Sequence, residues 1–340
     1  MQDDTECGKC GLCRTVCPVF DTNGIETLSP RGKIKISKSG ITSERAAEVL
    51  LLCAMCKRCD EICPSGVDVT KTIIEGREKI REFMPEKINE ISEVIEKTGN
   101  ILGRKTEDNQ EIKCTGKLQY YAGCMGKYRT EDYNATIKIL NKLGIDYYVN
   151  KETCCGEIFE LLGMDAEMEK FRDKNNFSDD VVVTCPGCYN ALIPAANVKH
   201  FTEFLDNFLN ENENENFKII HEPVRIAYHD PCDLGRRLKI YEPPRNVLKK
   251  VEGVTLVEFK DNPENAKCCG AGGSVMFLNT KTSTAIAENR VKGIEKHTDL
   301  IVTACPTCKV NLRLACKRMR NGVEVKTISE FLGDCEIRDL

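Results

Sequence analysis

The spacing of the cysteines constrains this chain more than any other feature of its sequence. The 340 residues include 21 cysteines, and all but three of these fall into four ordered groups. Two groups repeat the motif C-x2-C-x2-C-x3-C-P, and the other two repeat the pattern C…CCG…C-x2-C. Because thiolates at such spacings are typical ligands of iron–sulfur clusters, the pattern predicts a protein that carries electrons.

The first two groups lie near the N-terminus, and each ends at a proline. Their cysteines are Cys7, Cys10, Cys13 and Cys17 in the first motif, and Cys53, Cys56, Cys59 and Cys63 in the second. When two such motifs share a domain, the fourth cysteine of each ligates the cluster of the other. The sequence therefore predicts two [4Fe–4S] cubanes, with Cys63 completing the first set of ligands and Cys17 completing the second.

A zinc site and a disulfide scaffold both fit these cysteines less well. Zinc sites combine two C-x2-C pairs and do not place four cysteines in one short run. Disulfide scaffolds are short and secreted, whereas the acidic start MQDDTECGKC reaches its first cysteine too soon for a signal peptide. We therefore expect a cytoplasmic protein with reduced thiols, and its association with a membrane partner stays open.

The other two groups mark an internal duplication. One contains Cys124, Cys154, Cys155, Cys185 and Cys188, and the other contains Cys232, Cys268, Cys269, Cys305 and Cys308. YYAGCMGKYR aligns with YHDPCDLGRR at the first cysteine of each group, and VVVTCPGC aligns with IVTACPTC at the last pair. Each half is predicted to be a β–α–β–α–β unit with its cysteines after strands, at the edge where open α/β sheets bind ligands.

The predicted fold class is α/β, with a helical N-terminal domain followed by two duplicated Rossmann-like βαβ domains. The long gap between Cys17 and Cys53 predicts inserted helices and resembles the helical ferredoxin domains of respiratory iron–sulfur proteins. Helices are expected at 84–98 and 130–143, and strands at 117–123, 145–149, 180–185, 224–231, 254–259 and 300–305. The expected divisions are a ferredoxin-type domain at 1–98, a linker at 99–116, the first repeat domain at 117–210, a linker at 211–223 and the second repeat domain at 224–340.

Composition and missing motifs exclude several other classes of function. The net charge of −4 at pH 7 does not favour binding to nucleic acid or to an anionic membrane surface. No apolar run is long enough for a membrane-spanning helix. The glycine-rich run at 270–273 lacks a nucleotide-binding pattern, and no flavin or haem motif is present. Electrons should therefore arrive from another redox protein, such as a flavoprotein, a cytochrome or a hydrogenase-linked protein.

The CCG repeats resemble the cysteine-rich domain of the heterodisulfide reductase superfamily. That superfamily also contains the iron–sulfur components of glycolate, lactate and glycerol-3-phosphate dehydrogenases. The order found here is a double ferredoxin motif followed by two CCG domains, and the resemblance covers nearly the whole chain. This order is most similar to the D-type branch of heterodisulfide reductase, or to a fusion of its C-type and B-type branches.

The resemblance implies a cofactor and a reaction for the duplicated half. Each five-cysteine set would hold a non-cubane [4Fe–4S] cluster, and the adjacent pairs Cys154–Cys155 and Cys268–Cys269 would be catalytic. The reaction would be reduction of a disulfide, in particular the coenzyme M–coenzyme B heterodisulfide of methanogenesis. The alternative is an electron-transfer component of a flavin-dependent lactate, glycolate or glycerol-3-phosphate dehydrogenase. Two complete CCG motifs favour the first interpretation, and the modest length keeps the second open.

Basic residues follow the first cysteine of each CCG motif. Lys127 and Arg129 follow Cys124, and Arg236 and Arg237 follow Cys232. Since guanidinium groups bind carboxylates, sulfonates and phosphates in a bidentate manner, these residues are candidates for holding an anionic substrate. The alternative is that they only balance charge near the clusters.

Two further features of the second half are ambiguous from sequence. His229 and Asp230 precede Cys232 and have no counterpart in the first half, so they are either structural hydrogen-bonding residues or a proton donor for a departing thiolate. Cys114, Cys316 and Cys335 fall outside the motifs and are expected to be ordinary thiols.

Overall fold

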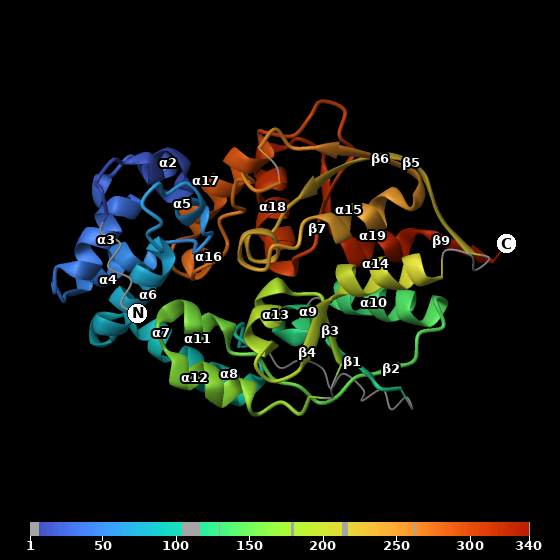
Figure 1. Cartoon of the computed structure of the whole chain (residues 1–340), viewed down its shortest axis with the longest axis horizontal. Helices are drawn as coiled ribbons and strands as arrows, with labels where there is room; N and C mark the ends of the chain where they lie inside the picture. The colour runs from blue at the N-terminus through green and yellow to red at the C-terminus, as the bar shows by residue number, and fades with distance from the viewer. Residues whose placement is uncertain are drawn as a thin grey trace.

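A helical N-terminal region packs against two α/β units, and the predicted fold class is confirmed. The computed structural model describes residues 7–103, 116–128, 130–177, 180–212, 217–261 and 263–339. In Figure 1 the blue and cyan helices lie at one end, with the second α/β unit above the first. Within the described ranges no helix combines the length and the apolar character that crossing a membrane requires.

The N-terminal region is built from short helices. They are α1 (Leu12–Val16), α2 (Pro18–Asn23), α3 (Pro30–Lys38), α4 (Glu44–Leu51), α5 (Arg58–Glu61), α6 (Val69–Lys79), α7 (Glu86–Asn89) and α8 (Ile91–Thr98), with 3-10 turns η1 (Glu26–Leu28) and η2 (Arg81–Phe83). Proline opens α2 and α3, and the side chains of Cys17 and Ser29 accept hydrogen bonds from the first turns. The proline after the first motif therefore starts a helix directly beside a predicted ligand.

The first α/β unit is a four-stranded parallel sheet with the order β2-β1-β3-β4. Its elements are β1 (Leu118–Tyr121), α9 (Gly123–Tyr128), α10 (Thr130–Lys142), β2 (Tyr147–Tyr148), α11 (Glu157–Leu162), α12 (Asp165–Arg172), β3 (Asp180–Val183), α13 (Pro186–Leu192), β4 (Asn197–His200) and α14 (Phe201–Glu211). The chain goes from β1 to one side of the sheet and then returns past β1 to β3, so the order reverses between β1 and β3.

The second unit repeats this topology with the order β6-β5-β7-β8. Its elements are β5 (Phe217–His229), the π-helical turn η3 (Asp233–Arg237), α15 (Glu242–Lys249), β6 (Val251–Glu258), α16 (Val275–Leu278), α17 (Thr280–Val291), β7 (Leu300–Thr303), α18 (Pro306–Met319), β8 (Glu324–Thr327), α19 (Ile328–Asp334) and β9 (Glu336–Asp339). The last strand, β9, pairs antiparallel with the start of β5.

Two edge strands and the start of β5 differ from the expectation. Sequence predicts three strands in each half, whereas each sheet has a fourth parallel strand, β4 or β8. These are edge strands in which only alternate residues are buried, so their short polar sequences carry a weak strand signal. β5 begins at Phe217, inside the segment expected to be a linker, because residues 217–220 pair with β9.

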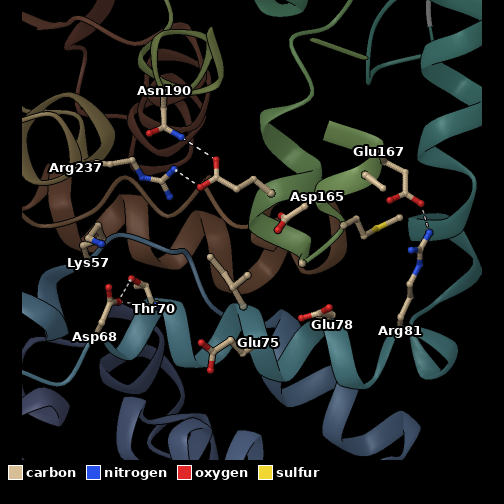
Figure 2. A pocket seen from close by; sticks show the side chains of 16 residues that line it. Lys57, Asp68, Thr70, Glu75, Glu78, Arg81, Asp165, Glu167, Asn190 and Arg237 are labelled. Carbon is tan, nitrogen blue, oxygen red and sulfur yellow. Dashed lines mark hydrogen bonds and ion pairs between the residues drawn. The ribbon is translucent and has the colours of Figure 1, made fainter. Parts of the chain in front are cut away.

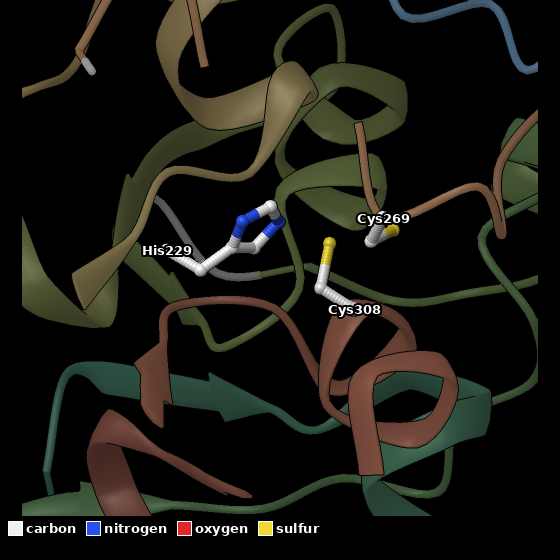
Figure 3. A group of neighbouring side chains, drawn as sticks. All are labelled: His229, Cys269 and Cys308. Carbon is white, nitrogen blue, oxygen red and sulfur yellow. The ribbon is translucent and has the colours of Figure 1, made fainter. Parts of the chain in front are cut away.

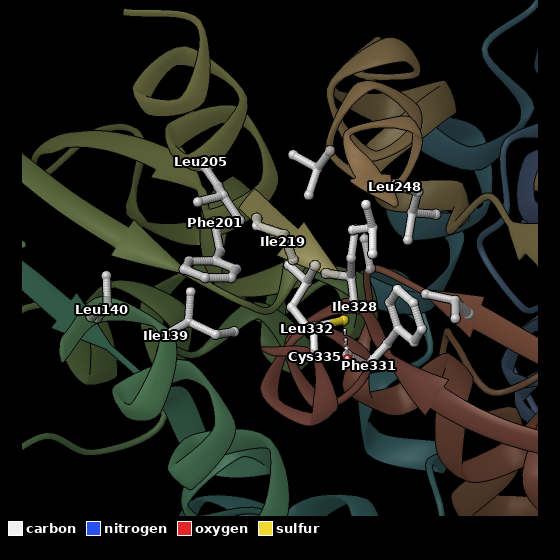
Figure 4. Close-up of a cluster of buried hydrophobic side chains, with 14 of the residues drawn as sticks. Ile139, Leu140, Phe201, Leu205, Ile219, Leu248, Ile328, Phe331, Leu332 and Cys335 are labelled. Carbon is white, nitrogen blue, oxygen red and sulfur yellow. Dashed lines mark hydrogen bonds between the residues drawn. The ribbon is translucent and has the colours of Figure 1, made fainter. Parts of the chain in front are cut away.

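One hydrophobic core joins the two α/β units. Helix α10 of the first half contacts α19 of the second, and α14 of the first half contacts α15 of the second. Since α10 corresponds to α15 and α14 to α19, the two contacts are equivalent. The buried side chains that fill this core, shown in part in Figure 4, include Tyr120, Ile139, Leu140, Phe201, Leu205, Ile219, Tyr228, Leu248, Ile328, Phe331, Leu332 and Cys335. These equivalent contacts relate the two α/β units by an approximate two-fold axis, and both units contribute side chains to the core.

A buried arginine on α6 connects all three parts of the molecule. Arg77 is fully buried, and its guanidinium donates hydrogen bonds to main-chain carbonyl oxygens. The acceptors are Leu50, Leu51 and Cys53 in the helical region, Leu161 in the first α/β unit and Gly273 in the second. Burial lowers the pKa of Arg77 to about 10, so it keeps its charge at neutral pH.

We expect Arg77→Met to lower the free energy of unfolding by about 3–5 kcal/mol, because it leaves several buried carbonyl groups without a donor. Arg81→Met is the matched control. Arg81 is exposed and pairs with Glu167, so its loss should cost at most about 1 kcal/mol. Anaerobic urea unfolding of both variants measures the difference, and equal midpoints would contradict a joining role for Arg77.

Candidate iron–sulfur site

The ten CCG cysteines lie at the carboxyl edges of the two sheets. Cys124 follows β1 and Cys185 follows β3, and these are the neighbouring strands at which the strand order reverses. Cys232 and Cys305 occupy the same places after β5 and β7. This is the crevice in which open α/β folds bind ligands.

The glycine of each CCG motif is required by the backbone. Gly156 has a φ of 87°, and a Cβ atom there would lie 2.7 Å from the carbonyl oxygen of Met168. Gly270 has a φ of 82°, and its Cβ would lie 2.6 Å from the carbonyl oxygen of Ser283. Only glycine combines a positive φ with such a close approach, so it allows the chain to turn directly after the paired cysteines.

The five thiols of each half form the same chain of contacts. In the first half, each thiol shifts the pKa of the next along the order Cys124, Cys154, Cys155, Cys188 and Cys185. In the second half the same holds along the order Cys232, Cys268, Cys269, Cys308 and Cys305. Five converging, largely buried thiols fit an iron–sulfur cluster. Cysteine binds metal as a thiolate, and several buried thiolates are stable together only when a metal balances their charge.

The structure also brings the ferredoxin cysteines into the predicted crossed sets. Burial raises the pKa of the Cys13 thiol, and the charges of its neighbours Cys7, Cys10 and Cys63 raise it further. The second set surrounds a small cavity, whose lining includes Cys17, Cys53, Cys56 and Cys59. Each fourth cysteine therefore lies with the other motif, an arrangement that fits two cubanes; the individual ligand assignments stay predictions.

A buried lysine beside the second set was not predicted from sequence. Lys33 on α3 lines the same cavity and donates to the carbonyl oxygen of Leu28. Burial lowers the pKa of Lys33, while the neighbouring thiols of Cys53 and Cys17 raise it. A cation at this position offsets part of the negative charge that a thiolate-bound cluster carries. The cysteine motifs give no signal for this lysine, because it lies in the segment between Cys17 and Cys53.

The two CCG sets face each other across the approximate two-fold relation. Helix α9, which carries Cys124, contacts α18, which begins after Cys305. In the same way α13, which begins after Cys185, contacts η3 after Cys232. The neighbouring Cys308 lowers the pKa of the Cys305 thiol, burial raises it, and the charge of Cys185 in the other half raises it further. The ten cysteines thus belong to one composite site.

The second CCG set also contacts the second ferredoxin motif. Cys56 and Cys268 lie in one buried cluster, and the neighbouring Cys268 thiol lowers the pKa of Cys56 to about 6. The glycine-rich run at 270–273 packs on the ferredoxin loop. A Cβ on Gly272 would lie 2.7 Å from the carbonyl oxygen of Ala54, and one on Gly273 would overlap the carbonyl oxygen of Cys53. These glycines therefore let the two cysteine loops come together.

The basic residues expected to bind substrate have partners inside the protein. Lys127 pairs with Glu152, with 3.7 Å between Nζ and Oε1. Arg236 is buried and donates to the carbonyl oxygens of Cys56, Glu264 and Ala266. These contacts give Lys127 and Arg236 structural roles, and those of Arg236 join the second unit to the ferredoxin loop. Arg129 lies outside the described residues.

Arg237 lines a cavity of about 590 Å³ between the helical region and the first α/β unit (Figure 2). Its Nη1 lies 2.8 Å from Oε1 of Glu157 and 3.6 Å from Oε1 of Glu160. Burial raises the pKa of Glu157, which Arg237 opposes. The cavity wall carries more acidic than basic residues: besides Glu160 and Arg237 it has Asp68, Glu75, Glu78, Asp165 and Glu167 against Lys57, Lys71 and Arg81. Arg237 therefore enters this cavity already neutralised, and the wall does not form a basic anion site.

The two ambiguous residues before Cys232 have different surroundings. Asp230 makes a bidentate ion pair with Arg245, with distances of 2.7 and 2.8 Å, which supports the structural interpretation. His229 lies instead beside two predicted ligands. One of its ring nitrogens and the sulfur atoms of Cys269 and Cys308 all lie within 4.8 Å of one another (Figure 3).

Of the cysteines outside the motifs, Cys335 lies in the core between the α/β units, whereas Cys316 shares a buried cluster with Cys269, Cys305 and Cys308. Cys316 and Cys335 are buried in hydrophobic cores, and the Cys335 thiol donates to the carbonyl oxygen of Phe331. Cys114 lies outside the described residues.

Comparison with known families agrees with this division of the cysteines. The 4Fe-4S dicluster domain family matches residues 4–67, and the cysteine-rich domain family CCG matches residues 118–193 and 226–313. The chain is a CCG-domain iron–sulfur oxidoreductase. This confirms the prediction that the chain belongs to the heterodisulfide reductase superfamily.

Similar proteins carry names that refer to several reactions. This CCG-domain protein is 28% identical to the D-type component of the dihydromethanophenazine:CoB–CoM heterodisulfide reductase of Methanosarcina acetivorans, over 95% of this chain and 91% of that one. It is 26% identical to the B-type component of the fumarate reductase (CoM/CoB) of Methanothermobacter marburgensis, over 96% and 71%. It is also 26% identical to the EtfAB:quinone oxidoreductase of Syntrophomonas wolfei, over 91% and 54%.

The iron content of the CCG-domain protein should approach about sixteen atoms per chain after anaerobic purification, counted as four clusters of four. Atomic absorption together with a protein assay measures this value. About eight atoms per chain would mean that the CCG sets hold no four-iron clusters.

The crossed ligand sets predict which cluster each variant loses. We expect Cys63→Ser to damage the exposed cubane of Cys7, Cys10 and Cys13, and Cys17→Ser to damage the buried one. In paramagnetic resonance spectra of the reduced variants, each variant should lose one cubane signal, and the two lost signals should differ. Loss of the same signal in both variants would show that the fourth cysteines do not cross.

Proposed function

We propose that this chain takes up electrons at its ferredoxin-type cubanes and uses them at the paired CCG clusters to reduce a disulfide. One observation carries the proposal: two complete five-thiol sets face each other, and one of them contacts a ferredoxin motif through Cys56 and Cys268. A disulfide has two sulfur atoms, and its reduction to two thiols consumes two electrons and two protons. Two facing sites match a substrate of this kind.

The surroundings of the four sets support a direction for the electrons. Cys10 in the first ferredoxin motif is exposed, whereas the adjacent pairs Cys154–Cys155 and Cys268–Cys269 are buried. An exposed set suits exchange with a partner protein, and buried sets keep water away from the reacting sulfur atoms. The second ferredoxin motif lies between the first motif and the CCG sets, because its Cys56 contacts Cys268 of the second CCG set. When bound, the CCG clusters would supply the electrons and would be the place where the sulfur atoms of the substrate react.

The substrate we propose is the heterodisulfide of coenzyme M and coenzyme B. The full-length similarity to the D-type component from Methanosarcina acetivorans supports it. The structure adds one limit, because Lys127, Arg236 and Arg237 all have internal partners. Binding of the anionic groups of that substrate would therefore require rearranged ion pairs or residues other than these three.

An electron-transfer component of a larger complex is the second candidate function. In that case the CCG sets would pass electrons between a flavoprotein that oxidises lactate, glycolate or glycerol 3-phosphate and a further acceptor. Similar chains named for fumarate reduction and for quinone reduction support it, because the same kind of chain occurs in proteins named for different reactions. Two facing, complete five-thiol sets favour disulfide reduction.

The deciding assay uses the anaerobically purified chain, reduced with a viologen dye and supplied with the heterodisulfide. We expect thiol release with viologen oxidation, and a drop of about a hundredfold or more in Cys154→Ala and Cys268→Ala, with cubane signals retained. Cys316→Ala is the matched control, since it removes a buried thiol outside all four sets and should keep full activity.

Two results would contradict the proposal. One is absence of turnover by a chain that contains all four clusters. The other is unchanged thiol release in both CCG variants. Tight copurification with a flavoprotein, together with absent turnover, would support the electron-transfer alternative.

A further inference from the structure

The two CCG sites differ at one position beside their ligands. The aligned segments place Tyr121 in the first half where His229 stands in the second. Tyr121 is buried close to Cys155 and Cys188, and His229 is buried close to the equivalent Cys269 and Cys308. The two side chains therefore occupy matching places but offer different chemistry to their clusters.

The hydroxyl group of Tyr121 is used elsewhere. It donates a hydrogen bond of 2.5 Å to the carbonyl oxygen of Thr153. A phenol has one proton to donate, so Tyr121 has none left for a sulfur atom. The first CCG set thus has an aromatic wall at this position without a hydrogen-bond donor.

The imidazole of His229 is fixed so that its free donor faces sulfur. Nε of Arg290 donates to Nδ1 of His229 at 3.1 Å. A neutral imidazole whose Nδ1 accepts carries its proton on Nε2. Nε2 has no hydrogen-bond partner among the described residues, and a ring nitrogen of His229 lies within 4.8 Å of the sulfur atoms of Cys269 and Cys308 (Figure 3). Arg290 lies over the Phe259 ring, 3.7 Å from its centroid, which holds the guanidinium in place.

We propose that His229 donates a hydrogen bond from Nε2 to the Cys269 thiolate and thereby gives the second CCG cluster a higher reduction potential than the first. The proposal rests on the proposed function, since it requires both clusters. Hydrogen bonds to ligand sulfur withdraw electron density and stabilise the reduced state of a cluster. His229 acts through a ligand, so it is a tuning residue.

This difference orders the electrons within the pair. Cys268, beside Cys269, is the thiol that contacts the ferredoxin motif through Cys56. The site with the extra donor is therefore the one at which electrons arrive. A higher potential there favours transfer from the cubane to the second set and makes the first set the less favourable place for the same electron.

The test compares His229→Phe with His229→Gln by potentiometric titration monitored with paramagnetic resonance. His229→Phe keeps a ring but removes the donor. It should lower the potential of one CCG cluster enough to change the one-electron equilibrium between the two sites about tenfold, or about 59 mV. His229→Gln restores an amide donor and should recover part of the shift. Tyr121→Phe is the matched control and should leave both potentials unchanged.

The outcomes separate this proposal from the function on which it rests. Unchanged potentials in His229→Phe, with all clusters present, would overturn the tuning role and leave disulfide reduction standing. An equal shift of both CCG clusters would also overturn it, because a local hydrogen bond affects one site. Absence of CCG clusters from the unaltered protein, shown by about eight iron atoms per chain, would overturn both proposals.

Discussion

The guanidinium of Arg77 is the interaction on which the arrangement of the three parts depends. It is buried and has carbonyl partners in the helical region, the first α/β unit and the second. A charged donor without solvent is costly unless it is fully hydrogen-bonded, and here the full set of acceptors is present only when all three parts are in place. One acceptor is the carbonyl of Cys53, a predicted ligand. The same group therefore fixes the domains and the loop of the second cubane.

The shared core makes the two CCG halves a single functional unit. Helix α10 contacts α19 and α14 contacts α15, so separating the halves would expose the apolar faces of both. Burial of this kind is the main favourable contribution to association of the halves. Because the sheets are held in this relation, the carboxyl edges that carry Cys185 and Cys305 come together. Duplication of one fold thus produces a composite site that neither copy could form.

Cysteine spacing predicted much of this from sequence, and the reason is chemical. Ligands of one cluster must be close in space, so Cys63 and Cys17 could be assigned to the opposite motifs before any fold was known. Strands before Cys185 and Cys305 were recognisable because they are buried, β-branched runs. Edge strands β4 and β8 were missed, since half of each faces solvent. Long-range contacts could not be predicted: Arg77 and Gly273 lie 196 positions apart.

Arg236 shows why residue type alone was misleading near the clusters. Its position after Cys232 suggested a substrate-binding cation, but three carbonyl oxygens hold it between the second unit and the ferredoxin loop. Its Nη2 has no partner among the described side and main chains, and the thiols of Cys56, Cys232 and Cys268 are the neighbours that favour its charge. A buried cation beside thiolates from two cluster sets stabilises added electrons on either side. Together with the proposed His229 donor, Arg236 would give the second CCG set the higher reduction potential, so the duplicated halves would share a fold and differ in potential.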